Sequence, residues 1–137
     1  MNEAWYPSLD YLKKLFKILK KQYPDLRNVN DMDDFKIKGI LDRLKYGLPY
    51  RELSFMEKIA RYIYDMSNLH PLSDGNKRLA YFSTEIILSK NGYHIIANDD
   101  EKVDFMEKIS TTNDDYEYKD KIQLIEKWFE QHCKSSD

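Results

Sequence analysis

The sequence predicts an all-α protein, a compact single-domain bundle of about six helices spanning residues 1–137. Apolar residues recur every three or four positions through most of the chain, which is the pattern of amphipathic helices. Capping residues and glycine or proline stops separate these stretches. Hydrophobic residues make up 42% of the chain and aromatic residues 14%, which is enough for one sizeable core.

Two helices are predicted in the first part of the chain. Ser8 can cap the first helix, which Pro24 ends. Residues 25–34 are polar and acidic without a clear period, and we expect an ordered loop or a short β-hairpin there. Helical spacing resumes over residues 35–44, and Gly47 ends this second helix.

A third and a fourth helix follow, joined by a short loop. Ser54 and Glu57 have the spacing of a capping box, and the third helix should stop before Pro71. The fourth helix is predicted over residues 76–90. Its apolar residues spread over much of the circumference, so it should be central and buried. Asn91-Gly92 is a strong stop, because both residues tolerate left-handed backbone angles.

The last part of the chain predicts two more helices. Either Asp99 or Asp100 could cap a short fifth helix with apolar positions over residues 103–109, and residues 122–129 mark a sixth. A strand pattern is found in residues 93–97 alone. The chain is therefore predicted to be helical almost throughout.

Charge and cysteine content limit the classes of partner. The 22 basic and 24 acidic residues leave a net charge of -2, which gives no overall electrostatic reason to bind nucleic acid or an anionic membrane. Cys133 is the single cysteine, which suits a reducing compartment. No signal peptide and no apolar stretch of about 18 to 20 residues is found. We therefore expect a soluble cytoplasmic protein.

The segment HPLSDGNKRLA, residues 70–80, carries the strongest functional signal. Lys77 and Arg78 stand at the head of the fourth helix, where the helix dipole disfavours a cation by about 0.3–1 kcal/mol. A bound polyphosphate would explain them, because unpaired amides at a helix start attract phosphate. Gly75 would let the backbone approach the ligand, and Asn76 could cap the helix or donate to a phosphate oxygen.

Two further residues of this segment could complete a reaction centre. Asp74 lies beside the expected anion site, where Mg2+ bound to phosphates usually takes one or two protein carboxylates. His70 could be the general base for an attacking hydroxyl, because its unperturbed pKa of about 6.5 suits proton transfer. An ordinary turn with an N-cap is the simpler interpretation, but it leaves Lys77 and Arg78 unexplained.

Residues 70–78 resemble the signature loop of the Fic/Doc superfamily, and the Asn-Lys-Arg-x-Ala ending is most similar to the Doc (death-on-curing) toxins. The likeness extends over residues 35–96 in the order of helices and connections. It implies the all-α Fic/Doc fold, with or without a small β-hairpin flap. It also implies roles for residues of the loop: base for His70, Mg2+ ligand for Asp74, anion cradle for Gly75 and Asn76, and phosphate contact for Arg78.

The position of Lys77 distinguishes between reactions within this superfamily. The resemblance places glycine there in adenylyl-transferring Fic enzymes and lysine in Doc, whose nucleotide binds in the reverse sense. It therefore implies a kinase that transfers phosphoryl from ATP to a Ser or Thr hydroxyl of a target protein, such as a translation factor. Leu72 replaces the motif's aromatic residue, and Tyr81 replaces its second arginine.

Regulation and alternatives follow from the same likeness. No self-inhibitory Ser/Thr-x-x-x-Glu-Gly/Asn segment is found, so a separate antitoxin is the expected partner. Two alternatives stay open: a Fic-type adenylyl or other nucleotidyl transferase, and a catalytically silent module that binds a nucleotide or an antitoxin helix. The sequence leaves the target, the nucleotide base and the oligomeric state undefined.

Overall fold

The computed structural model describes residues 3–23, 33–69, 76–110 and 117–136. In these residues the chain forms six α-helices and one two-stranded antiparallel sheet, so the prediction of a helical bundle is confirmed. The elements are α1 (Leu9–Gln22), α2 (Asp34–Tyr46), α3 (Phe55–Asn68), α4 (Asn76–Lys90), β1 (Tyr93–Ile95), α5 (Asp99–Ser110), α6 (Tyr118–His132) and β2 (Cys133–Ser135). None of the described helices is long and apolar enough to cross a bilayer.

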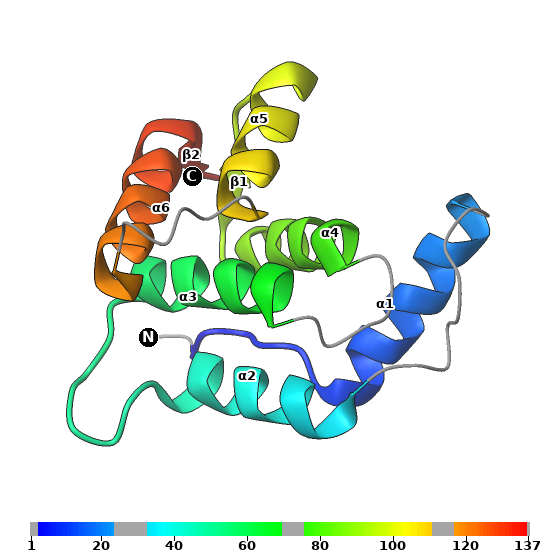
Figure 1. Cartoon of the computed structure of the whole chain (residues 1–137), viewed down its shortest axis with the longest axis horizontal. Helices are drawn as coiled ribbons and strands as arrows, with labels where there is room; N and C mark the ends of the chain where they lie inside the picture. The colour runs from blue at the N-terminus through cyan, green and yellow to red at the C-terminus, as the bar shows by residue number, and fades with distance from the viewer. Residues whose placement is uncertain (1–2, 24–32, 70–75, 111–116, 137) are drawn as a thin grey trace.

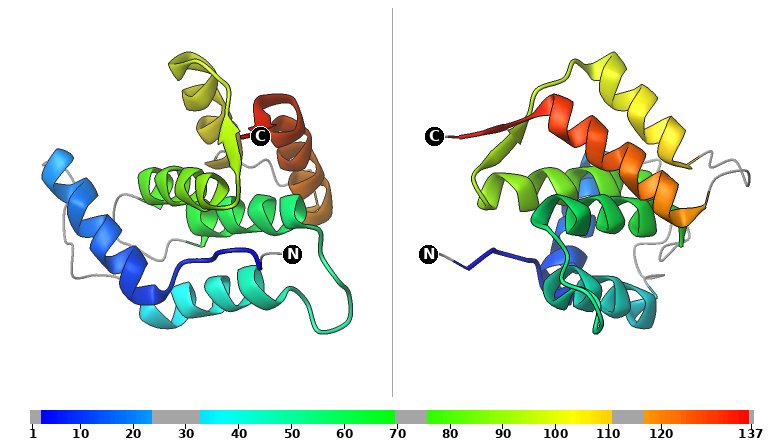
Figure 2. Two further views of the ribbon diagram at one scale, coloured as in Figure 1. Left: turned by 180° about the vertical axis from the view of Figure 1, so that it is seen from behind. Right: turned by 90° about the vertical axis from the view of Figure 1, so that its left-hand side faces the viewer.

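Helices α3 and α4 form the middle of the molecule. Helices α1 and α2 lie on one side of this pair, and α5, α6 and the small sheet lie on the other (Figures 1 and 2). The prediction that α4 is central is confirmed, since it packs against α1, α3, α5 and β1. Side chains from all three parts are fully buried in the core, including Phe16, Tyr62, Leu79 and Phe129.

Polar residues predicted to cap helices do so in the structure. The hydroxyl groups of Ser8 and Ser54 accept hydrogen bonds from the backbone N–H three residues later, at 3.1 and 3.2 Å. Asp33 caps α2 in the same way at 3.1 Å, and Asp34 is the first residue of that helix. The predicted loop or hairpin over residues 25–34 therefore ends earlier than expected, and its residues 25–32 lie outside the described part.

The cap of α5 differs from the prediction. Asn98 Oδ1 accepts a hydrogen bond from the Glu101 N–H at 2.8 Å, and the Glu101 carboxylate accepts one from the Asn98 N–H at 3.1 Å. This is a reciprocal capping box. Asp99 and Asp100 are helical residues of the first turn, because Asn98 has an acid three residues later to complete the box.

A small sheet closes the C-terminal side of the bundle. Helix α4 has the predicted bounds, and Gly92 follows it with a φ of 87°. The predicted strand over residues 93–97 is confirmed over Tyr93–Ile95, which pairs antiparallel with Cys133–Ser135. That partner strand was not predicted.

The side chain of Asn91 holds the N-terminal segment, through hydrogen bonds of 2.8 and 2.9 Å with the backbone of Trp5.

Candidate functional site

The predicted site lies where α3 ends and α4 begins. His70, Asp74 and Gly75 fall in residues 70–75, outside the described part of the chain, so their roles stay predictions. Asn76, Lys77 and Arg78 form the first turn of α4, as predicted. Asn76 and Arg78 are half-buried and Lys77 is exposed. The structure therefore places the two cations together at the predicted helix start, directly after residues 70–75, which form the motif loop between α3 and α4.

The first turn of α4 differs in charge from the other described helices. Helices α1, α2, α3, α5 and α6 each carry at least one acidic residue in the first turn, whereas α4 carries none. The helix dipole stabilises acidic side chains at that position and destabilises cationic ones. Lys77 and Arg78 therefore add their charge to an end that is already positive. Such an end is chemically suited to a phosphate.

The start of α4 is fixed to the core by the residues that follow the two cations. Leu79 and Ala80 are fully buried. One turn later, the Ser83 hydroxyl lies 2.7 Å from the hydroxyl of Tyr62 on α3, and both groups are buried. These contacts hold α3 and α4 against each other, so the two ends of the motif loop keep a fixed separation.

The other end of the loop is held by neighbouring helices. Lys36 Nζ on α2 donates a hydrogen bond of 3.1 Å to the carbonyl of Leu69, the residue directly before His70. Asn68 Nδ2 donates to the carbonyl of Ile109, the second-to-last residue of α5, at 3.2 Å. The sequence analysis missed both contacts, because a lysine and an asparagine near helix ends look like ordinary surface residues.

Arg78 has an aromatic neighbour that the sequence analysis also missed. Its guanidinium carbon lies 4.4 Å from the ring centroid of Tyr23, within the range of a cation–π contact. Tyr23 is the C-cap residue of α1 and is half-buried. The sequence showed it only as an apolar position of an amphipathic helix.

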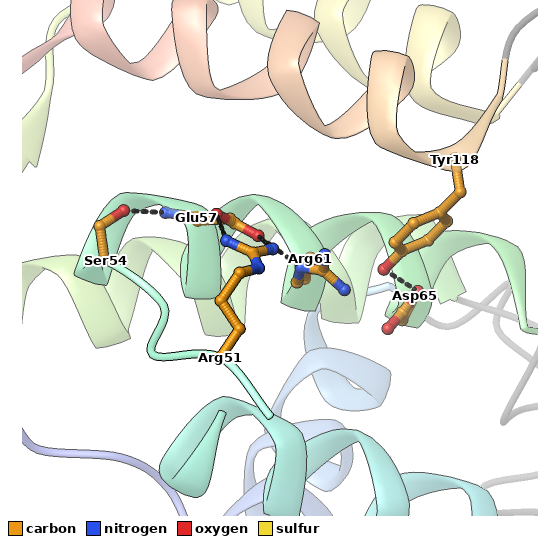
Figure 3. A network of polar contacts seen from close by, with 6 residues as sticks. All are labelled: Arg51, Ser54, Glu57, Arg61, Asp65 and Tyr118. Atoms are coloured by element: carbon orange, nitrogen blue, oxygen red, sulfur yellow. Dashed lines mark hydrogen bonds and ion pairs between the residues drawn. The ribbon is translucent and has the colours of Figure 1, made fainter. Parts of the chain in front are cut away.

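A second group of charged residues surrounds the opposite end of α3. The Glu57 carboxylate accepts hydrogen bonds from Arg51 at 3.0 and 2.6 Å and from Arg61 at 2.9 Å (Figure 3). The two hydrogen bonds from Arg51, more than the one from Arg61, hold the pKa of Glu57 below its ordinary value. A cavity of about 440 Å³ lies beside this group, and Lys119 and Glu126 of α6 also line it. The lining is therefore mostly charged, with Ile122 and Gln123 of α6 completing it.

Asp65 extends the polar contacts along α3. Its carboxylate accepts a hydrogen bond of 3.1 Å from the Tyr118 hydroxyl (Figure 3). The same carboxylate lies 3.7 Å from Arg43 of α2. Burial raises the pKa of Asp65, and the hydrogen bond from Tyr118 opposes that shift. Asp65 therefore joins α3 to the start of α6 and to α2, and it lies a full turn before the motif loop.

The magnesium ion predicted from the sequence would be held mainly by a ligand's phosphates. In the described ranges, no three or more His, Cys, Asp or Glu side chains gather in a way that could hold a metal ion. Mg2+ at nucleotide sites needs only one or two protein carboxylates beside the phosphates. Asp74, the predicted ligand, lies outside the described part of the chain, so the magnesium site stays a prediction.

The family of the chain is shown by comparison with known proteins. A family model described as Fic/DOC family matches residues 6–88, more than half of the 137 residues. The match covers α1, α2 and α3, the motif loop and most of α4. The chain belongs to the Fic/DOC family. This membership supports a transferase that moves nucleotidyl or phosphoryl groups. No curated protein and no solved structure matches the chain.

Proposed function

We propose that the protein is a Doc-like kinase that transfers a phosphoryl group from ATP to a Ser or Thr hydroxyl of a target protein. The single observation that carries this proposal is the pair Lys77 and Arg78 in the first turn of α4, the one described helix without an acid there. Family membership supports transfer from a nucleotide. The lysine directly before Arg78 favours phosphoryl over adenylyl transfer, because the Fic enzymes that transfer adenylyl groups carry glycine at that position of the motif.

Six residues of the motif take part in the proposed reaction. His70 accepts the proton of the attacking hydroxyl, whose oxygen forms a bond to the γ-phosphorus while the bond to the β,γ-bridging oxygen breaks and ADP leaves. Gly75 and Asn76 bind phosphate through the helix start. Lys77 and Arg78 stabilise the negative charge on the phosphates. Asp74 would hold Mg2+, which neutralises phosphate charge when bound.

ATP labelled separately at the α and γ positions distinguishes the candidate reactions. Incubation with a cell extract and Mg2+ should transfer the γ label to protein, and His70→Ala should abolish the transfer. Transfer of the α label would contradict the kinase and establish adenylyl transfer. No transfer of either label by a protein that still binds ATP would indicate a silent nucleotide-binding module.

The cellular role proposed here is that of a toxin restrained by a separate antitoxin protein. Expression of the wild-type protein in the cytoplasm should arrest growth, and His70→Ala should relieve the arrest. A translation factor is the proposed target, to be identified by mass spectrometry of the labelled protein. Equal growth of cells with the wild-type protein and with His70→Ala would contradict the toxin role.

A further inference from the structure

Arg78 must present its donors to a triphosphate from a fixed place, and its long side chain does not provide that by itself. A free arginine side chain has about 2 kcal/mol of rotamer entropy to lose on binding. A contact on the face of the guanidinium reduces this loss without using the N–H groups, because these donors point outward in the plane of the group. An aromatic ring on that face therefore positions arginine and leaves it able to bind an anion.

Tyr23 supplies such a ring. Its centroid lies 4.4 Å from the guanidinium carbon of Arg78, which is a close cation–π distance. We propose that Tyr23 is a positioning residue that holds the Arg78 guanidinium for the nucleotide phosphates. This inference rests on the proposed function, because it requires Arg78 to bind the phosphates of a nucleotide.

The structure fixes Tyr23 on two sides. Its backbone N–H donates to the carbonyl of Leu19 at 2.8 Å, which closes the last turn of α1. Its ring packs on Phe82 of α4, with 6.3 Å between the centroids and 30° between the planes. Phe82 lies one helical turn after Arg78, so both side chains project from the same face of α4. The Tyr23 ring therefore connects the end of α1 to the first two turns of α4, where Arg78 and Phe82 lie.

This arrangement gives α1 a part in nucleotide binding. The first helix contributes no residue to the motif, yet its C-cap residue sets where Arg78 lies. A displacement of the end of α1 would move the ring away from the guanidinium and weaken phosphate binding.

The test compares ATP affinity in matched variants. Isothermal titration with Mg2+ and ATP should give a dissociation constant about 3- to 30-fold higher for Tyr23→Leu than for wild type. Tyr23→Phe keeps the ring and should bind within about twofold of wild type. Tyr11→Leu is the control. It removes a tyrosine of α1 whose ring contacts Trp5 and not Arg78. It should leave the affinity unchanged.

A double-mutant cycle separates positioning from a general loss of structure. In the Arg78→Ala background, Tyr23→Leu should change the ATP dissociation constant by less than about twofold, because the group it positions is gone. An equal loss in both backgrounds would overturn the inference. NMR of the wild type gives a readout that needs no variant to fold: the Arg78 Nε–H resonance should be shifted upfield by the ring, and Tyr23→Phe should preserve the shift. An unshifted resonance would also overturn it.

Failure of the inference and failure of the proposed function give different results. If Arg78→Ala weakens ATP binding and Tyr23→Leu does not, the positioning role of Tyr23 is wrong and the kinase proposal stands. If wild type binds no ATP, or Arg78→Ala binds it as wild type does, the proposed function is wrong and the inference fails with it.

Discussion

A charge reversal at Lys77 tests whether the start of α4 is kept positive for an anion. Lys77 is exposed in the first turn, where a cation opposes the helix dipole by about 0.3–1 kcal/mol and an acid gains a similar amount. Lys77→Glu should therefore stabilise the nucleotide-free protein by about 0.6–2 kcal/mol. For a chain of this length the melting temperature should rise by roughly 2–8 °C.

Lys90 provides the matched control, since it lies in the last turn of the same helix and is also exposed. Lys90→Glu makes the same change in net charge at the negative end of the dipole, so it should lower the melting temperature. Loss of the cation 5.4 Å from the ring centroid of Trp5 adds to that effect. Both shifts should shrink in 1 M salt, where the Debye length is about 3 Å.

The same Lys77→Glu variant should lose nucleotide affinity. Reversing the charge beside the phosphates removes one favourable interaction and introduces repulsion, so ATP should bind at least about tenfold more weakly by calorimetry. A more stable protein that binds ATP poorly is the expected combination. Two results would refute the reasoning: a melting temperature lowered as much as in Lys90→Glu, or unchanged ATP affinity.

Two further predictions concern the cap of α5 and the ion pairs of Glu57 on α3. Asn98→Ala removes the capping box of α5 and should destabilise the protein by about 1 kcal/mol in urea unfolding, while Asp99→Ala should have a smaller effect; equal losses would contradict the assigned cap. Glu57 has a folded-state pKa below its ordinary value of 4.5, so its contribution is present above pH 4.5 and is lost as the pH falls through the folded-state pKa. Glu57→Gln should accordingly lower the melting temperature at pH 7. The difference in melting temperature between the variant and wild type should become smaller below about pH 4.5. A difference independent of pH would contradict this role of the carboxylate.

Local signals made the helices predictable. The bounds of α4 could be predicted from the sequence because a turn-forming Asp-Gly sequence precedes it and Asn91-Gly92 follows it, and both signals act within a few residues. The cap of α5 was predicted one or two residues too late, at Asp99 or Asp100, since three consecutive residues can cap and only the partner Glu101 decides among them. Strand β2 has three residues and no alternating pattern, and its pairing with β1 depends on the packing of α6.

The candidate site was predictable only where it is contiguous in sequence. Asn76, Lys77 and Arg78 follow one another, and their position in a helix start is a local property. The contacts of Tyr23 with Arg78 and of Lys36 with the Leu69 carbonyl join residues far apart in the chain. Such contacts arise from the way α1 and α2 pack on the central pair, which no spacing within one segment reveals.

The two cations of α4 are adjacent in sequence and differ in environment, which argues for different tasks. Arg78 is half-buried against an aromatic ring, which suits the role proposed for it, in which its planar group makes two parallel hydrogen bonds to phosphate. Lys77 is exposed, and its ammonium group acts as a compact charge on a flexible stem. Because orientation matters for one position and charge for the other, Arg78→Lys should impair nucleotide binding more than Lys77→Arg.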